Sequence, residues 1–404
     1  MKILMVNKFF HVKGGSETYY FALKKLYESL GHQVIDFSTV NDLNEPSPYA
    51  PYFVQDIDYH QDYSLIQKIQ IAGRFIYSSE AKEKMRKLIQ DTKPDVIHLH
   101  LYHHQISPSI LDVMDGIPCI YTAHDLQMLC PNYQMMHDGV ICEECIHGSG
   151  WPCIRHRCVM NSLGKSALSA MEYTIHRKRN PYRRIHCILT PSEFYRRKFL
   201  EAGFSEEKVF HIPNFIPGTP CAGARLRHGN YLLYAGRLSE EKGLMTLLKA
   251  AEGMSIPLHI VGTGPMEASL RQRAEACGLT QVVFYGFLQG EELKEQISQA
   301  KAVVLPSEWY ENGPYSLIEA LSYGRPVIAA RIGGLPEMID GNGILFSAGD
   351  ADQLSNAMRR MQDMPFEEWA LLSQRSAELF QRDYTETHHL ELLRQVYGLM
   401  GMEL

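Results

Sequence analysis

Two glutamates in the second half of the chain have the type and spacing of residues that bind a polar ligand. Glu311 and Glu319 lie in the segment EWYENGPYSLIE, with a glycine and a proline between them that indicate a loop. A helix should begin near Tyr315, which puts Glu319 about one turn inside it. The open amides of Tyr315 and Ser316 would face an anionic or hydroxyl-rich ligand, and a carboxylate can accept two hydrogen bonds from a ribose. Taken alone, the pattern is better explained by helix capping and a surface glutamate.

Two basic residues follow a predicted strand earlier in the same half. Arg237 and Lys242 belong to the segment GRLSEEKG, on either side of a strand-to-helix turn. Two cations in that position could hold a diphosphate and stabilise its charge as it leaves. The alternative is solvated surface charge, which describes most arginines and lysines.

A glycine pair stands between the first strand and the first helix. Gly14 and Gly15 in HVKGGSE would let the backbone approach a ligand closely, and the helix start offers free N–H groups to an anion. A plain tight turn is the alternative. The full dinucleotide fingerprint is missing, which disfavours an oxidoreductase.

Five of the nine cysteines fall between positions 130 and 158. Cys142 and Cys145 have the spacing of a zinc knuckle, and Cys153 and Cys158 could complete a four-sulfur site. We therefore expect a structural zinc ion in a cysteine-rich insertion over 126–160, with no role in catalysis. A loop of free thiols is the alternative.

Apolar strands separated by helical patterns must position these residues. The first half contains the runs KILMVN, HQVIDFS, DVIHLHL, PCIYTAH, HCILTPS and KVFHIPN. The second half contains YLLYAGRL, PLHIVGTG, VVFYGF, KAVVLPS, RPVIAA and GILFS. This alternation predicts two parallel sheets, each covered on both faces by helices.

The boundary between the halves should lie in 213–230, a stretch rich in Pro and Gly without periodicity. We expect an N-terminal domain over 1–214 and a C-terminal domain over 218–380. A helix in 381–404 would cross back to the first domain. Both domains should be Rossmann-like α/β folds with doubly wound sheets, facing across a cleft at the carboxyl ends of their strands.

The order of the motifs resembles that of glycosyltransferase family 4. Gly-Gly-x-Glu, Gly-Arg-Leu-x-x-x-Lys-Gly, Gly-x-Gly-Pro (262–265) and Glu-x7-Glu follow one another over nearly the whole chain, most closely over 230–345. The resemblance implies the GT-B fold, a UDP- or GDP-sugar donor, retention of anomeric configuration and no metal for catalysis. The short Asp-x-Asp pattern at 56–58 lies in a polar loop and is discounted as a metal site.

The resemblance also implies roles for single residues. Glu319 would bind the ribose, Glu311 the transferred sugar, and Arg237 with Lys242 the diphosphate. The full set of donor-binding residues implied is Gly14, Gly15, Arg237, Lys242, Gly264, Phe287, Glu311, Asn312, Gly313, Tyr315, Ser316 and Glu319.

His124 in the segment YTAHD matches a family position that contacts the donor sugar near the reacting carbon. A histidine satisfied at a strand end is the alternative. The residues implied to act in catalysis are His124, Arg237, Lys242 and Glu311. No carboxylate occupies a nucleophile's position in the family pattern, so the resemblance implies a reaction on one face of the sugar, governed by positioning and charge stabilisation.

Composition limits the partners. The 404 residues carry a net charge of −6, which gives no support to nucleic-acid binding. The N-terminal apolar run is too short for a signal peptide and no run of 18 apolar residues occurs, so we expect a cytoplasmic protein. Eight Arg or Lys, interleaved with aromatic residues, lie in 176–200. They could attach the chain to the anionic inner face of the cytoplasmic membrane, close to a lipid-linked acceptor, although a solvated helix face is an equal alternative.

We therefore predict a hexosyltransferase that acts on a glycan or lipid-linked acceptor in cell-surface polysaccharide or glycolipid biosynthesis. A nucleotide-sugar epimerase or a phosphorylase would share the fold, but no cofactor lysine or alternative acid–base motif is present. An interaction protein built on the cysteine module, with a degenerate transferase fold, is disfavoured because Arg237, Lys242, Glu311 and Glu319 are all intact.

Overall fold

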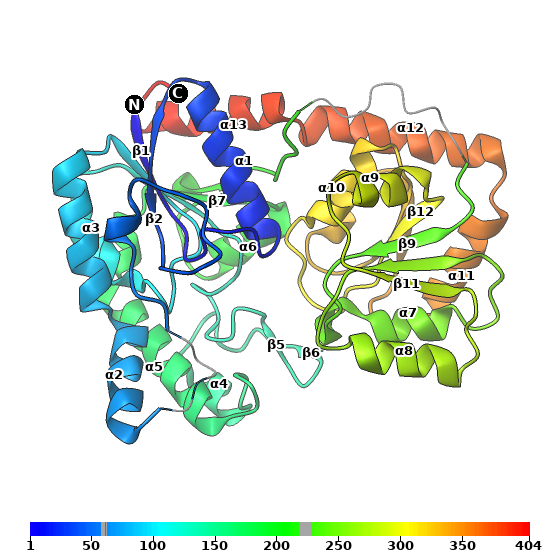
Figure 1. The fold of residues 1–404 in the computed structure, drawn as a ribbon, viewed down its shortest axis with the longest axis horizontal. Coiled ribbons are helices and arrows are strands. Elements are labelled where there is room, and N and C mark those ends of the chain that lie inside the picture. The colour runs from blue at the N-terminus through cyan, green and yellow to red at the C-terminus, as the bar shows by residue number, and fades with distance from the viewer. Residues whose placement is uncertain (58–60, 62, 219–227) are drawn as a thin grey trace. The chain divides into compact units, whose positions relative to one another are not determined.

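The computed structural model describes residues 1–57, 61, 63–218 and 228–404. It divides into two compact units (Figure 1). Unit 1 comprises Met1–Pro191, Tyr195–Ile212 and Leu393–Leu404. Unit 2 comprises Ser192–Phe194 and Pro213–Leu392. Part of the predicted linker, 219–227, lies outside the described residues.

Unit 1 is built on a parallel sheet. Its six strands are β1 (Lys2–Val6), β2 (Gln33–Phe37), β3 (Val96–Leu99), β4 (Cys119–Thr122), β7 (Cys187–Thr190) and β8 (Val209–His211). The order is β2-β1-β3-β4-β7-β8, so the strand order reverses between β1 and β3. Ligands bind at such a reversal, beyond the carboxyl ends of the strands.

Helices cover both faces of this sheet. They are α1 (Gly15–Ser29), α2 (Leu65–Ile76), α3 (Ser79–Thr92), α4 (Trp151–Arg155), α5 (Leu163–Arg179) and α6 (Glu193–Glu201), whose first two residues belong to unit 2. Ser64, Ser78 and Ser162 cap the amino ends of α2, α3 and α5 by accepting backbone N–H groups. A two-stranded hairpin of β5 (Met136–His137) and β6 (Val140–Ile141) lies in the cysteine-rich insertion.

Unit 2 contains a second six-stranded parallel sheet. Its strands are β9 (Leu232–Ala235), β10 (Leu258–Val261), β11 (Val282–Gly286), β12 (Ala302–Leu305), β13 (Val327–Ala330) and β14 (Gly343–Phe346). The order β11-β10-β9-β12-β13-β14 reverses between β9 and β12. The two sheets confirm the predicted Rossmann-like α/β fold.

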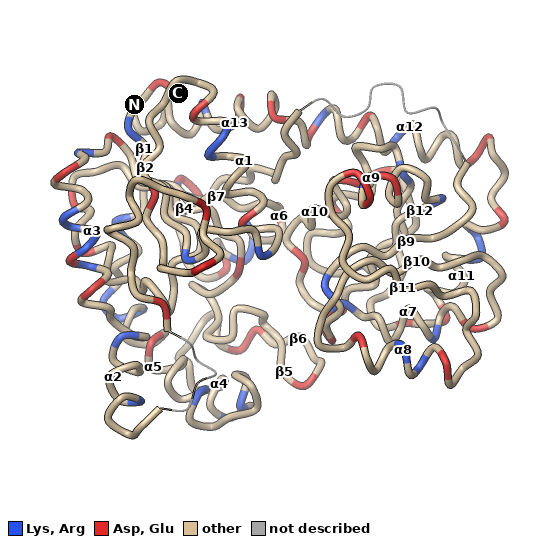
Figure 2. Tube along the Cα trace, viewed as in Figure 1, with Lys and Arg blue, Asp and Glu red and all other residues tan. Residues whose placement is uncertain are grey.

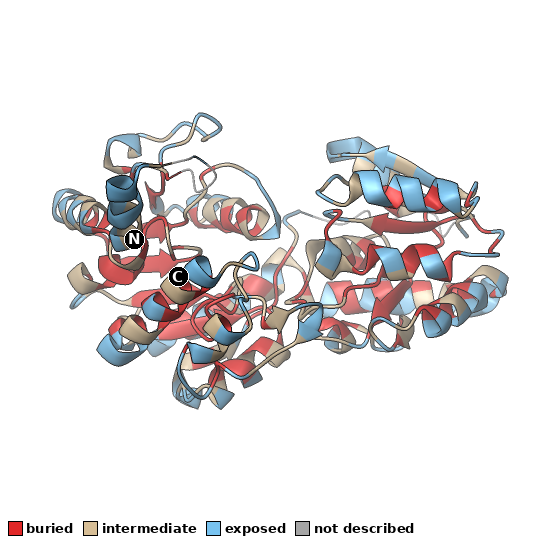
Figure 3. Cartoon of the chain, turned by 90° about the horizontal axis from the view of Figure 1, so that it is seen from below, coloured by how far each residue is buried: buried red, intermediate tan, exposed pale blue. Residues whose placement is uncertain are grey.

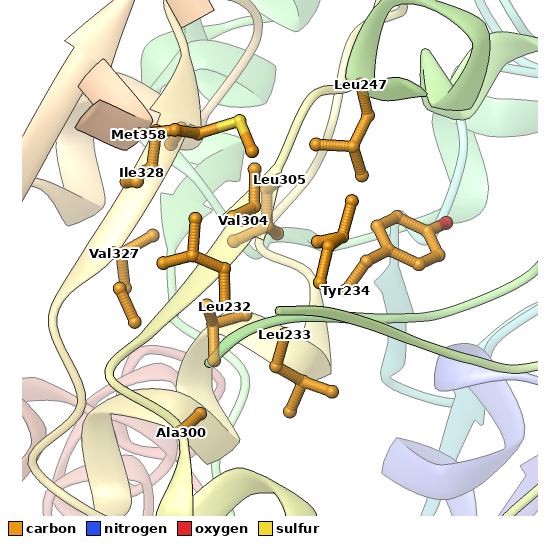
Figure 4. Packing of buried hydrophobic residues seen from close by; sticks show 14 of the residues in the cluster. Leu232, Leu233, Tyr234, Leu247, Ala300, Val304, Leu305, Val327, Ile328 and Met358 are labelled. Carbon is orange, nitrogen blue, oxygen red and sulfur yellow. The ribbon is translucent and has the colours of Figure 1, made fainter. Parts of the chain in front are cut away.

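The helices of unit 2 enclose its hydrophobic core. They are α7 (Leu244–Ala250), α8 (Glu267–Ala276), α9 (Gly290–Gln299), α10 (Tyr315–Ser322), α11 (Ala351–Asp363) and α12 (Phe366–Asp383). Leu233 of β9, Val304 of β12 and Leu247 of α7 are among the buried side chains of this core (Figure 4). Figure 3 shows that most strands of the two large sheets are buried while many helices keep one exposed face, as the sequence pattern of alternating strands and helices predicts. The edge strand β11 is an exception, with intermediate and exposed residues in alternation.

The last helix, α13 (Glu386–Leu399), begins in unit 2 and ends in unit 1. Leu393, Val396 and Tyr397 are buried, and the Tyr397 hydroxyl donates to the Tyr27 hydroxyl of α1 at 3.0 Å. The closing residues of the chain are therefore part of the packing of unit 1.

All twelve predicted strands are present. The hairpin β5–β6 and the helix α2 had no prediction, because the segments that form them show no clear period in the sequence. Along α3 and α8, Figure 2 shows acidic and basic residues interspersed. No helix in the described part of the chain is long and apolar enough to cross a membrane.

Candidate active-site residues in the two units

The candidate donor site of unit 2 lies at the reversal of strand order, where the segments after β9 and β12 begin. Gly243 has φ +68°, and a Cβ at this position would overlap the carbonyl oxygen of Pro306, just after β12. Gly262, after β10, would overlap the carbonyl oxygen of Gly236 in the same way. Only glycine allows these loops to approach so closely.

Lys242 and Glu311 form an ion pair in this site. The Lys242 Nζ lies 2.7 Å from Glu311 Oε1, and the Ser307 hydroxyl donates to the same oxygen at 2.6 Å. Lys242 also lies over the Trp309 ring, 4.8 Å from its centroid. The sequence predicted both charged residues, but it did not predict that they are direct partners, nor that Ser307 takes part.

The electrostatic state of Glu311 follows from these contacts. The carboxylate is 5% exposed, and burial alone would raise its pKa. The charge of Lys242 and the hydrogen bonds from Lys242 and Ser307 outweigh burial and hold the pKa of Glu311 below its usual value. Glu311 is therefore ionised at neutral pH.

A glycine pair missed by the sequence analysis supports the Glu311 loop. Gly333, with φ +58°, would place a Cβ 2.5 Å from the Glu311 nitrogen. The Gly334 N–H donates to the Glu311 carbonyl at 2.8 Å. The sequence contained a signal for this pair, because Gly333 and Gly334 come after β13 as Gly14 and Gly15 come after β1.

Glu319 lies one turn inside α10, which begins at Tyr315 as predicted. It differs from Glu311 because no cation of the described residues forms an ion pair with it, and burial raises its pKa to about 7. A half-buried carboxylate of this kind is stabilised by ligand groups that donate hydrogen bonds to it.

Two side-chain hydrogen bonds hold the loop between the two glutamates in place. The Asn214 side chain donates to the Gly313 carbonyl at 2.9 Å, and the Ser192 hydroxyl donates to Asn312 Oδ1 at 3.2 Å. Tyr315 and Ser316 are the first two residues of α10, so their amide groups lie at its amino end.

The remaining predicted donor residues of unit 2 lie at strand ends. Arg237 is exposed, and the described residues provide no ion-pair partner for it. Gly264 packs against Leu238, where a Cβ would collide with the backbone. Phe287 follows β11 and is 68% exposed.

In unit 1, Gly14 and Gly15 lie at the amino end of α1, as predicted, and both are exposed. Glu17, in the first turn, is buried and accepts hydrogen bonds from Ser16 at 3.0 Å and Asn7 at 3.4 Å. Burial raises the pKa of Glu17 despite these bonds. The helix start thus carries a carboxylate beneath its two glycines.

His124 lies directly after β4, in a column of stacked imidazoles. Its Nε2 is 3.0 Å from His100 Nδ1, and the His98 ring stacks on His100 at 4.6 Å. His98 in turn is 2.8 Å from the Thr122 hydroxyl. Burial lowers the pKa of His124 to about 3, so it is neutral and acts as a hydrogen-bonding group rather than a cation.

The sequence analysis did not predict a charged cluster near His124. Asp125, the last residue of the segment YTAHD, belongs to this cluster, and the sequence had assigned it no role. Burial lowers the pKa of Lys8, while Asp125 and Glu17 act in the opposite direction. Burial raises the pKa of Asp125. Glu172 of α5 is 2% exposed, with His104 Nε2 3.3 Å from its carboxylate, and neither oxygen accepts a hydrogen bond from any described residue.

The predicted basic segment 176–200 differs from the expectation. Tyr195 and Phe199, two of the interleaved aromatic residues, are 3% and 0% exposed, so they belong to the core. At least four of the eight basic side chains form ion pairs within the described residues. The pairs are Arg179 with Asp112, Arg184 with Asp115, Arg196 with Glu206, and Lys198 with Glu143 and Glu201.

The predicted zinc ligands Cys142, Cys145, Cys153 and Cys158 line one small cavity in unit 1. Cys130, which was not in the predicted set, lines the same cavity. All five are free thiols.

Two parallel six-stranded Rossmann-like sheets, each with a reversal of strand order, have the architecture of the GT-B fold. The family models agree: Glycosyltransferase Family 4 matches residues 13–217, and Glycosyl transferases group 1 matches residues 225–376. The chain belongs to glycosyltransferase family 4, as its motifs predicted.

Similar proteins support this assignment. The O-antigen chain mannosyltransferase C of Escherichia coli is 30% identical over 172 residues, which are 42% of this chain and 46% of that protein. The match thus spans about half of the relative. Sucrose-phosphate synthase of Thermosynechococcus elongatus has the same fold, with a TM-score of 0.72, 20% identity and 99% of both chains covered. HepE of Anabaena, in complex with UDP and glucose, has a TM-score of 0.66, 17% identity and 99% of both chains covered.

Proposed function

We propose that the chain transfers a hexose-type sugar from a UDP- or GDP-sugar, with retention of configuration, to a glycan or lipid-linked acceptor. Its role would be in cell-surface polysaccharide or glycolipid biosynthesis. Two comparisons support the proposal: the mannosyltransferase relative is named for the O-antigen chain, and the HepE neighbour is a complex with UDP and glucose.

The observation that carries the proposal is the Lys242–Glu311 ion pair at the strand reversal of unit 2. Lys242 would shift toward the diphosphate of the donor, where a cation stabilises the charge that develops as the nucleotide leaves. Glu311 would accept hydroxyl hydrogen bonds from the transferred sugar. Because one lysine contacts the residue that holds the sugar, binding of sugar and diphosphate would be coupled.

Glu319 would hold the ribose. Burial raises the pKa of its carboxyl, and two ribose hydroxyls would donate hydrogen bonds that stabilise the ionised form. Arg237 would contribute a second cation to the diphosphate. The exposed Phe287 would offer a flat apolar surface to the base.

The surroundings of Glu311 favour transfer on one face of the sugar over double displacement. A nucleophilic carboxylate needs free lone pairs near the anomeric carbon. One oxygen of Glu311 already accepts from both Lys242 and Ser307. These bonds reduce its nucleophilicity and suit it to positioning the sugar.

For the acceptor we propose the polar cluster of unit 1. Glu172 carries two buried oxygens without hydrogen-bond donors in the described part of the chain, an arrangement that costs free energy until a ligand supplies them. Asp125 and Lys8 lie in the same charged cluster. An acceptor rich in hydroxyl groups fits such a site.

The test measures transfer and donor hydrolysis with a panel of nucleotide sugars. Lys242→Ala and Arg237→Ala should each lower turnover by about 100-fold or more, the usual effect of removing one group that stabilises developing charge. Lys249→Ala, an exposed lysine of α7, is the matched control and should leave turnover unchanged. Normal turnover in both site variants would refute the diphosphate assignment.

We also propose peripheral attachment to an anionic membrane, with a different surface from the predicted one. Leu65, Ile66 and Ile69 of α2 are 76%, 71% and 66% exposed, and they lie at helical spacing on one face. Lys68 on the same helix is exposed. Apolar side chains with adjacent basic residues suit the headgroup region of an anionic bilayer.

Vesicle sedimentation tests this attachment. The chain should pellet with vesicles that contain anionic lipid and bind less to neutral vesicles. Ile66→Ser with Ile69→Ser should reduce binding at least tenfold, while Arg184→Ala, which only breaks the pair with Asp115, should not. Equal binding to both kinds of vesicle would contradict the role of charge.

A further inference from the structure

A cavity of about 360 Å³ lies in unit 1, beside the segments that precede β7 and β8. Cavities that hold small organic molecules usually have about 300–1,000 Å³. Arg177 and Arg183 line the cavity and are exposed, so it opens to the surface. Its size would admit an organic ligand, whereas a single inorganic anion would leave much of it empty.

Most of the lining comes from the chain between α5 and β7 and between α6 and β8, at the amino ends of these two strands. Met128 and Leu129 reach the cavity from the loop after β4. Substrates of parallel sheets bind beyond the carboxyl ends of the strands, where His124 follows β4. The cavity therefore borders the loop of His124 but contains none of the residues assigned to the donor.

Three cations line this cavity and are not neutralised by the protein. Arg177, Arg183 and Lys208 form no ion pair with any residue that the structure describes. No aspartate or glutamate of the described ranges lines the cavity either. The cavity thus has a positive charge that only a ligand or solvent ions would balance.

The basic residues next to these three are neutralised within the chain. The pairs are Arg179 with Asp112, Arg184 with Asp115, and Arg196 with Glu206. Glu206 lies on the same short helix as Lys208 (Glu206–Lys208), yet it pairs with Arg196 at 2.7 Å. The unbalanced charge is therefore a property of the cavity and not of the whole basic segment.

Neutral acceptors hold two of the three cations in place. The Arg177 Nη1 donates to the Ile146 carbonyl at 2.9 Å and to the Tyr173 hydroxyl at 2.6 Å. The Lys208 Nζ donates to the Ile185 carbonyl at 3.2 Å. These bonds position the side chains without cancelling their charge, so a ligand would meet cations that need little further ordering.

The floor of the cavity is apolar. Met128, Leu129, Ile185 and Ile188 line it, and all four are buried. Cations beside a buried apolar surface suit a ligand with an anionic group on an apolar body, because each part then meets its preferred surroundings.

We propose that this cavity binds a phosphate ester carried on an apolar body. The phosphate would contact Arg177, Arg183 and Lys208, and the apolar part would cover the floor. A phosphate ester has a charge of about −1.5 to −2 at neutral pH, so it matches three cations better than a carboxylate does. The donor fork of arginine also fits phosphate oxygens. Either a membrane lipid or a soluble phosphorylated metabolite could supply this chemistry.

Calorimetry with the full chain tests the two parts of the ligand. The probes are octyl phosphate, inorganic phosphate and octyl glucoside, which has the same alkyl chain without a charge. Octyl phosphate should bind about tenfold more tightly than inorganic phosphate or better, because its chain leaves water. Its affinity should fall as the salt concentration rises. Equal affinity for octyl phosphate and either of the other probes would overturn the proposal.

Single substitutions test the cations. Arg183→Gln and Lys208→Gln should each weaken octyl phosphate binding by about tenfold or more, the usual effect of losing one charge-assisted hydrogen bond. The Arg183 side chain donates no hydrogen bond to a described residue, so Arg183→Gln should unfold at the same temperature as wild type. Arg179→Gln is the matched control and should bind like wild type. Unchanged binding in both cavity variants, or an equal loss in Arg179→Gln, would contradict the assignment.

A phosphate could also enter the candidate donor site of unit 2, and Lys242→Ala separates the two sites. Octyl phosphate should bind this variant as tightly as wild type, because Lys242 does not line the cavity. Loss of binding in Lys242→Ala would assign the probe to the donor site and overturn the proposal. Since no transfer is measured, this result is independent of the proposed reaction.

Vesicles of phosphatidylcholine with phosphatidic acid distinguish the two sources. A membrane source predicts that Arg183→Gln binds these vesicles less than Arg179→Gln does. A soluble source predicts equal vesicle binding by the two variants, while their affinities for octyl phosphate differ. Equal affinity of the two variants for octyl phosphate would overturn the site for both sources.

Discussion

Glu311 and Glu319 are neighbours in the candidate donor site but have opposite electrostatic surroundings. Lys242 and Ser307 hold the pKa of Glu311 below its usual value against the effect of burial, whereas burial raises the pKa of Glu319 to about 7. Glu311 is thus satisfied before a ligand binds. Glu319 is partly buried without a cation beside it among the described residues, so a ligand that donates hydrogen bonds would stabilise its ionised form.

This difference predicts a pH dependence of stability. Because the pKa of Glu319 is raised in the folded state, the unfolded state binds fewer protons between its ordinary pKa, near 4.5, and about 7. Stability contributed by the protonated group is complete below pH 4.5 and is lost as pH rises through 7. Glu319→Gln should therefore stabilise the free enzyme at pH 8 by up to about 3 kcal/mol, and much less at pH 4.5. Thermal unfolding at both pH values measures the effect.

The same substitution should weaken the donor complex, because an amide accepts fewer hydroxyl hydrogen bonds than a carboxylate. A variant that gains stability at pH 8 and loses nucleotide affinity would support the assignment of Glu319 to the ribose. If Glu319→Gln has the same stability as wild type at pH 8, the carboxylate is not buried as described.

The sequence predicted these charged residues because their spacing around a helix start is readable. It did not predict Ser307, Gly333, Lys8 or Glu172. Gly333 acts on Glu311 through a contact that exists only once β12 and β13 are adjacent. Ser307 is four residues from Glu311 in the same loop, but only the folded loop brings its hydroxyl to the carboxylate. Glu172 lies on α5, far along the chain from His104, and nothing in the local sequence marks it as buried.

At the scale of elements, the approach of the loops after β9 and β12 determines the donor site. Gly243 separates the short helix of Lys242 (Glu240–Lys242) from α7, and its positive φ turns the chain there. The position of Lys242 thus depends on a residue with no side chain.

Gly243→Ala should destabilise unit 2 and also reduce turnover. A left-handed conformation costs a residue with a Cβ about 1–2 kcal/mol, and the overlap with Pro306 adds to this. Gly278→Ala is the matched control, since Gly278 has φ +64° and nothing within 4 Å of the added Cβ. Chemical denaturation should show a larger loss for Gly243→Ala. Equal losses would mean that the approach to Pro306 is looser than described.

The strands were predictable because continuous apolar runs of β-favouring residues are typical of a sheet buried on both faces. The helix α2 was not predictable, because Leu65, Ile66 and Ile69 are apolar but exposed. They obscure the contrast between an apolar buried face and a polar solvated face. Two aromatic residues of 176–200 differ in the opposite way. Tyr195 and Phe199 were grouped with a basic surface, but they pack inward from α6.

At the scale of the whole molecule, neither unit is one continuous stretch of chain. Unit 1 takes up the end of α13, where Leu393, Val396 and Tyr397 are 0%, 2% and 0% exposed. Composition alone places the domain boundary in the linker, and it does not show that the end of α13 belongs to unit 1.

Removal of 393–404 should destabilise unit 1. Loss of three buried side chains costs about 4–9 kcal/mol at the usual values for leucine, valine and aromatic residues, and the Tyr27 hydroxyl loses its partner. The expected result is a soluble yield well below wild type and a lower unfolding temperature. Removal of only 400–404, which are partly or fully exposed, is the control. Similar stability of both truncated chains would contradict the packing of α13 in unit 1.

The return of α13 also limits how specificity can be exchanged within the family. Recombination between two relatives at the linker would take the first segment of unit 1 from one parent and its last helix from the other. Residues such as Tyr27 and Tyr397 would then have to fit one another across parents. Exchanges with two crossovers, one in the linker and one before Leu393, would keep each unit intact and should give active hybrids more often.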